Sequence, residues 1–156
     1  MICRGMEARI MSADNRPDRL SVVVFSGSFD KVHYALAMAA AAVASNTPAT
    51  LFFTMGAARA LLAEDSAGPG WRRLHPTEDG AAPLEADAAL TAKGLGGFEE
   101  LLAACVALGT TVMVCEMGLR ALGLDLSQLR ADVPVTPGGL VSFLADASRH
   151  GAMVFV

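Results

Sequence analysis

The nucleophilic chemistry of this chain depends on three cysteines, and Cys115 is the best placed of them. It ends the apolar run TVMVC and stands directly before a stretch of helical character. Free backbone N–H groups and a helix dipole at such a junction lower a thiol pKa from about 8.5 toward about 3.5 to 7.5. The carboxylate of Glu116 opposes that shift. The pattern indicates either a reactive thiolate or a buried cysteine that packs as a small hydrophobic residue.

The other two cysteines fit no catalytic or metal-binding pattern. Cys105 shares helical spacing with the apolar residues of 98–108, Leu108 included, which predicts a packing role. Cys3 lies in a polar tail. Neither a CxxC redox motif nor a zinc ribbon can be built from these positions, so no metal and no cofactor is expected.

Three dispersed histidines complete the candidate acid/base groups. His33 is predicted to be a hydrogen-bonded, partly buried helix residue, and His75 to be a lid element or simply solvated. His150 is predicted in the last turn of a helix, where a cation is favourable. No Ser/His/Asp or Cys/His arrangement is visible, so an apolar thiolate site suits transfer of a soft atom such as sulfur better than hydrolysis.

Short apolar runs alternate with helical stretches along the chain. Strands are predicted at 21–26, 49–54, 111–115, 133–135 and 152–156. Helices are predicted at 31–45, 57–63, 98–108, 116–122, 126–130 and 136–150, the last with Thr136 as N-cap and Pro137 in its first turn. Strands that are apolar throughout and alternate with helices predict one parallel sheet with helices on both faces.

The chain is predicted to form a single domain at 21–156 after a polar tail at 1–20. A chain of about 150 residues buries close to 70% of its unfolded surface, so it needs no disulfide or structural metal. Apolar periodicity disappears at 64–97, a segment with three prolines. This predicts an irregular excursion loop or a partly disordered insertion.

Composition excludes several classes of partner. The net charge is −4 and only two lysines occur, Lys31 and Lys93, which argues against nucleic acid as a partner. The longest apolar run, 34–44, is too short for a membrane span, which needs about 20 residues. The charged tail lacks the apolar core of a secretory signal. We therefore expect a cytoplasmic protein with reduced thiols.

The candidate site follows from the rule that ligands bind where the carboxyl ends of parallel strands meet the next helices. Met113 and two other methionines are predicted to make this edge soft and apolar. The motif around Gly27 matches neither a Walker loop nor GxGxxG, so no nucleotide site is indicated. The candidate residues are Gly27, Ser28, Phe29, Asp30, Thr54, Met55, Cys115, Glu116, Met117, Thr136, Gly138 and Gly139.

Three segments carry a family resemblance: SVVVFSGSFDKVHYALAMAAAAVASNTPATLFFTMGAARALL, GFEELLAACVALGTTVMVCEMGLRALGLDLSQL and GGLVSFLADASRHGAMVFV. The most specific piece is VCEM at 114–117, followed by Leu119 and the turn at 122–124. Together they resemble the DsrE/DsrF-like sulfur-relay family, and more narrowly its DsrE-type sulfurtransferase branch, often labelled peroxiredoxin-like. The resemblance covers about 20–62 and 97–156.

The resemblance implies a three-layer α/β/α sandwich with a five-stranded parallel sheet, and a persulfide on Cys115 that is passed between sulfur carriers. It also implies sulfur donor and acceptor proteins or small thiols as partners, and assembly into trimers or hexamers. Glu116 and Gly118 depart from relatives, which often carry a small polar residue and Ser there.

Alternatives to the sulfur carrier or sulfurtransferase stay open. One is a non-catalytic small-ligand or protein-binding assembly module of the same fold. A flavodoxin-like cofactor binder is another.

Overall fold

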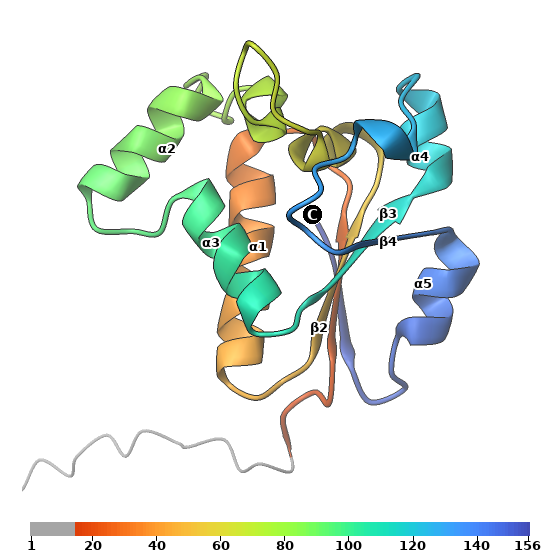
Figure 1. Ribbon diagram of the computed structural model, residues 1–156. Coiled ribbons are helices and arrows are strands. Elements are labelled where there is room, and N and C mark those ends of the chain that lie inside the picture. Colours follow the sequence, from red (N-terminus) through yellow and green to blue (C-terminus); the bar gives the residue numbers. More distant parts are fainter. Residues whose placement is uncertain (1–14) are drawn as a thin grey trace, which may run out of the picture.

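A computed structural model describes residues 15–156, so Cys3 and most of the predicted tail lie outside the described residues. Five parallel strands form one sheet in the order β4-β3-β2-β1-β5, with helices on both faces (Figure 1). This confirms the predicted α/β sandwich. The strands are β1 (Leu20–Val24), β2 (Ala49–Phe53), β3 (Thr111–Cys115), β4 (Val135–Gly138) and β5 (Ala152–Phe155).

The direction in which the chain builds the sheet decides how each face is covered. Each strand from β1 to β4 is added next to the one before it, on the same side of the sheet. Strand β5 is then added at the opposite edge, next to β1. Because parallel crossovers are right-handed, reversing direction transfers the connecting helix to the opposite face. Helices α1 (Phe29–Ala44) and α3 (Phe98–Ala107) therefore cover one face, and α5 (Leu140–Asp146) covers the other (Figure 1).

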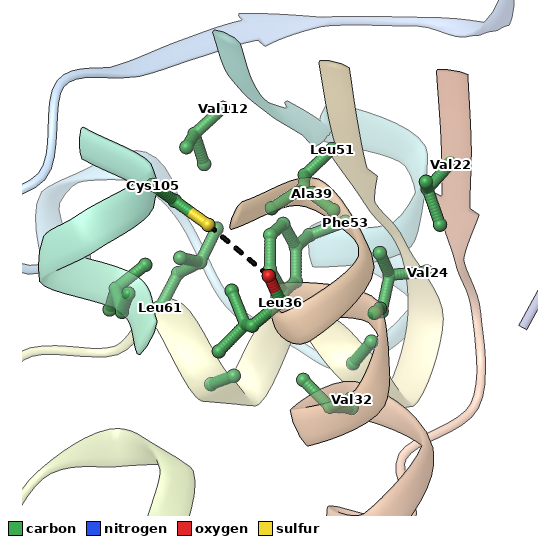
Figure 2. Packing of buried hydrophobic residues seen from close by; sticks show 14 of the residues in the cluster. Val22, Val24, Val32, Leu36, Ala39, Leu51, Phe53, Leu61, Cys105 and Val112 are labelled. Carbon is green, nitrogen blue, oxygen red and sulfur yellow. Dashed lines mark hydrogen bonds between the residues drawn. The ribbon is translucent and has the colours of Figure 1, made fainter. Parts of the chain in front are cut away.

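The main core lies between the sheet and α1 (Figure 2). Val22 and Val24 of β1 and Phe53 of β2 are fully buried in this core. Cys105 of α3 belongs to this core, and its Sγ donates to the Leu36 carbonyl oxygen at 3.4 Å. Burial raises the pKa of the Cys105 thiol. The packing role predicted for Cys105 is confirmed.

Most of the other elements lie within two residues of their predicted bounds. They include the short helices η2 (Met55–Leu61), α4 (Glu116–Ala121) and η4 (Leu126–Gln128). Leu108 differs from its prediction because it follows the end of α3 and is exposed rather than packed in the core. Within residues 15–156, no helix combines the length and the apolar character needed to cross a bilayer.

The helix predicted to start at Thr136 is wrong. Thr136 and Pro137 lie in β4, which pairs with β3 alone. Proline is tolerated there because an edge strand leaves some N–H groups unpaired. Strand β4 also replaces the strand predicted at 133–135. Helix α5 begins after Gly139 as N-cap, and it ends before His150, so no helix C-terminus explains that histidine.

The insertion at 64–97 is ordered, which corrects the prediction of an irregular or partly disordered segment. It contains the short helix η3 (Gly70–Arg73) and the ten-residue helix α2 (Pro83–Ala92). Trp71 is buried, and its ring stacks on Phe98 with centroids 5.3 Å apart. The area buried by one large aromatic side chain attaches the insertion to the main core, although the sequence of the insertion has no apolar periodicity.

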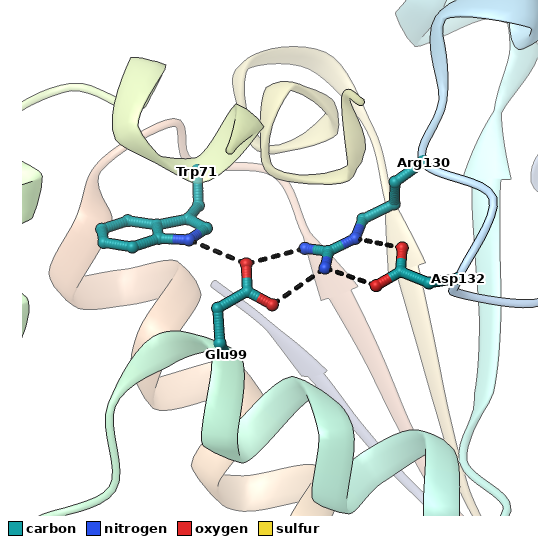
Figure 3. Close-up of polar contacts among 4 residues, drawn as sticks. All are labelled: Trp71, Glu99, Arg130 and Asp132. Atoms are coloured by element: carbon teal, nitrogen blue, oxygen red, sulfur yellow. Dashed lines mark hydrogen bonds and ion pairs between the residues drawn. The ribbon is translucent and has the colours of Figure 1, made fainter. Parts of the chain in front are cut away.

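A polar network fixes the same insertion to the rest of the fold (Figure 3). The Trp71 indole N–H donates to Glu99 at 2.9 Å. The Arg130 guanidinium donates to both carboxylate oxygens of Glu99 and to both of Asp132, at 2.7 to 2.9 Å. Hydrogen bonds from Arg130 lower the pKa of Asp132, and hydrogen bonds to Asp132 and Glu99 raise the pKa of Arg130. The network holds η3, α3 and the segment before β4 together.

Candidate functional site

Cys115 occupies the position that the sequence predicts, at the carboxyl end of β3, where it is the N-cap residue of α4. Its side chain points to the α5 face of the sheet and is 1% exposed. Phe52, Met113 and Phe143 share this second apolar cluster with the thiol. In this conformation the sulfur atom does not reach solvent.

Helix α5 provides the cover over this cluster. Its one buried side chain, Phe143, stacks on Phe52 with ring centroids 4.7 Å apart. At the carboxyl end of α5, Asp146 accepts hydrogen bonds from Thr50 at 2.6 Å and from Arg19 at 3.2 Å. The helix is therefore held by an aromatic contact near its middle and by hydrogen bonds from two residues at its end.

The loops that follow β1, β2 and β3 meet at the predicted edge of the sheet. A Cβ atom on Gly118 would lie 2.6 Å from the Met55 backbone nitrogen, so α4 packs directly against the loop after β2. A Cβ atom on Gly27 would lie 3.2 Å from the Gly56 Cα atom. Glycine at these positions lets the backbones approach closely. Gly138 pairs with Cys115 across the β3–β4 ladder.

Other predicted site residues serve other roles. Phe29 is fully buried in the main core beside Trp71, so it does not line the edge. Ser28 is the N-cap residue of α1, but its side chain makes no capping hydrogen bond. Met117 is exposed whereas Met113 is buried. The sequence predicted that the methionines together make the edge soft and apolar, but Met113 and Met117 lie in different environments.

Two histidines form hydrogen bonds between the insertion and the rest of the fold. His33 forms a hydrogen bond between its Nε2 atom and the Gly96 carbonyl oxygen at 2.8 Å, which confirms the predicted hydrogen-bonded histidine. His75 is exposed, and its backbone N–H donates to the Gly27 carbonyl oxygen at 2.8 Å. No sequence pattern indicated this contact, because His75 and Gly27 are 48 residues apart in the chain. Within residues 15–156, no cluster of three His, Cys, Asp or Glu residues could hold a metal ion.

The α5 face of the sheet is only partly covered. Alternate residues of β5 point to this face, and Met153 is 52% exposed. The outward side of α5 is also apolar, with Val141 83% exposed. We call this surface the apolar strip, which consists of Leu140, Val141, Leu144 and Met153. A parallel sheet is normally buried on both faces, so an exposed strip of this kind is unusual.

Comparisons with known proteins support the fold. The structure is similar to a solved protein of unknown function, MTH1491 from Methanobacterium thermoautotrophicum, with a TM-score of 0.53 and 13% identity. The match covers 88% of this chain and 98% of that one. No protein-family model and no curated protein matches the chain. At this identity the similarity shows a shared fold and carries no activity.

Proposed function

We propose that this protein carries sulfane sulfur as a persulfide on Cys115. The observation that supports the proposal is a free thiol at the carboxyl end of a central strand, where parallel sheets place their chemistry, under a single short helix. The family resemblance around VCEM at 114–117 favours the same residue. Cys105 is set apart by its hydrogen bond inside the main core.

The proposed step is a transfer of one sulfur atom between thiols. The Cys115 thiolate attacks the outer sulfur of a donor persulfide R–S–SH, the donor S–S bond breaks, and R–S⁻ leaves with the electron pair. The product is Cys115–S–SH, which an acceptor thiolate attacks in the same way. No net oxidation occurs and no cofactor is consumed. The thiolate form is the reactive species in each exchange.

The buried thiol requires α5 to move before a donor can reach it. The aromatic contact of Phe143 lies near Cys115, whereas the polar contact of Asp146 lies at the far end of the helix. We infer that the amino-terminal half of α5 lifts away while Asp146 stays bound to Thr50 and Arg19. Short elements with few buried contacts are the parts of proteins that open locally.

Sulfur loading tests the proposal directly. In a Cys3→Ser background, incubation with glutathione persulfide should add one sulfur atom to Cys115, seen by mass spectrometry of the intact protein and its peptides. Cyanide should remove that atom as thiocyanate. The Cys105→Ser variant should load like the parent, because its thiol is held in the core. If Cys115→Ala, folded by circular dichroism, takes up as much sulfur as the parent, Cys115 is not the carrier.

A second candidate function, an assembly module, is favoured by the apolar strip. We propose that a second copy of this chain covers it. The outward face of α5 is an apolar ridge, and the neighbouring part of β5 is an apolar surface without a helix. The ridge of one copy can therefore pack on the β5 surface of the next, either reciprocally or around a closed ring.

Light scattering measures this assembly. At about 100 μM we expect an oligomer, with a mass at least twice the 16.1 kDa of one chain. Val141→Glu should shift the mass toward the monomer, because a charge cannot be buried unpaired at such a contact. Leu108→Glu is the matched control, since Leu108 is exposed and directly follows α3, which covers the other face of the sheet (Figure 1). A monomeric parent, or the same shift in both variants, contradicts the proposal.

A further inference from the structure

A crevice of about 820 Å³ opens at the carboxyl edge of the sheet, where the strand order reverses between β1 and β5. In open α/β sheets this reversal point is the usual place for a ligand. The volume falls within the range of about 300 to 1,000 Å³ that small-molecule sites have. Its lining comes from the loops after β1 and β2, from the insertion and from the end of β5.

One wall of the crevice is apolar and aromatic. The rings of Phe25 and Phe155 lie 5.3 Å apart, and both side chains are substantially exposed. The backbone N–H groups of Phe25 and Ser26 donate to the Val156 oxygen at 2.9 and 3.0 Å, which holds the ends of β1 and β5 together. This wall can contact the flat face of an apolar group.

The polar lining of the crevice includes two basic side chains. Lys31 and His75 line it, and no Asp or Glu side chain does. Within the described part of the chain neither residue takes part in an ion pair. His75 is fixed through its backbone, which pairs with Ser28 as an isolated parallel bridge, and its ring Nδ1 lies 3.3 Å from the Cβ position of Gly27. Two basic residues therefore belong to the lining of the crevice.

Closely approaching backbone and one residue in an unfavourable conformation also line the crevice. Gly27 and Gly56 meet there without side chains. Met55 next to them has a φ of 47°, in the left-handed region that non-glycine residues rarely adopt. Strain of this kind persists where the surrounding structure imposes it, and it is concentrated at binding and catalytic sites.

From these features we propose that the crevice binds a small molecule in which an anionic group is joined to a flat apolar group. The anionic group contacts Lys31 and His75, and the apolar group lies against Phe25 and Phe155. This site is separate from Cys115, because neither Cys115 nor any other buried residue of its cluster lines the crevice. The inference therefore does not depend on sulfur transfer.

Phenyl phosphate is the probe that combines both groups. Titrated into ¹⁵N-labelled protein, it should shift the amide signals of 25–31, 55–56, 75 and 155–156, with a Kd of about 1 mM for a ligand of this size. Phenol and inorganic phosphate should each bind at least about tenfold more weakly, because each lacks one of the two groups. Equal binding of phenol overturns the anionic requirement, and shifts confined to other parts of the chain overturn the site.

Matched variants separate the two contributions. Lys31→Gln should weaken phenyl phosphate about tenfold, since it removes a charge-assisted contact. Lys93→Gln is the control, because Lys93 lies exposed after α2, outside the crevice. Phe25→Ala should weaken phenyl phosphate but not inorganic phosphate. Cys115→Ala should leave all of these affinities unchanged, so a failure of the crevice is seen separately from a failure of sulfur loading. An unchanged Kd in Lys31→Gln contradicts the proposal.

Discussion

Replacing Phe143 with alanine should accelerate alkylation of Cys115 by about a hundredfold to about a few thousandfold. Truncating a buried phenylalanine costs about 3 to 5 kcal/mol, and each 1.4 kcal/mol changes an equilibrium about tenfold. Phe143 is the one buried residue of α5 and stacks on Phe52 in the cluster that contains the thiol. The free energy lost on truncation of Phe143 therefore mainly favours the local opening of α5. Timed labelling with N-ethylmaleimide, followed by peptide mass spectrometry, measures the rate.

Cys105 is an internal control for this experiment. It is buried in the main core on the opposite face of the sheet, so it becomes reactive through wider unfolding rather than through movement of α5. Phe98→Ala truncates a buried phenylalanine on that other face and should not favour Cys115 over Cys105. Equal acceleration of both thiols in Phe143→Ala would show that the cover over Cys115 does not open locally.

Replacing Trp71 with alanine should lower the free energy of unfolding by about 3 to 5 kcal/mol. The indole ring is 3% exposed, stacks on Phe98 and lies 5.7 Å from the Phe29 ring. Its N–H also donates to Glu99, which holds Arg130. The substitution removes both the apolar contact of the ring and the hydrogen bond that joins the insertion to the polar network. Urea denaturation followed by circular dichroism measures the loss.

Trp71→Phe divides that loss into its parts. Phenylalanine keeps most of the ring contact and removes the hydrogen bond to Glu99, so a loss of about 1 to 2 kcal/mol is expected. Leu84→Ala, on the exposed side of α2, should change stability by less than about 0.5 kcal/mol. A small loss in Trp71→Ala would mean that the insertion is loosely attached, as its sequence suggested.

Apolar pattern was sufficient to predict most of the fold. The runs at 49–54 and 111–115 are apolar without alternation, because both faces of a central parallel strand are buried. Gly109 and Gly123 end helices at positive φ, where glycine has no steric penalty. Strand β4 was displaced because VTPG carries little apolar signal and its proline favoured a helix start.

The candidate site was predicted less completely. The position of Cys115 at the end of a strand follows from chain order alone. Alternation along β3 decides the face to which its thiol points, and the direction of the last crossover decides that α5 covers that face. The crevice combines the loops after β1 and β2 with the end of β5 and with His75 from the insertion. Such contacts join residues far apart in the chain, and no local pattern records them.

The sequence by itself determined a parallel α/β sheet with one thiol at its carboxyl edge, because strand and helix periodicities and glycine stops are local properties. The tertiary structure alone decided that this thiol is covered, that the insertion is docked through Trp71, and that an apolar strip remains exposed. The physical reason is the right-handed crossover: advancing strands place their helices on one face, and the single return places only α5 on the other.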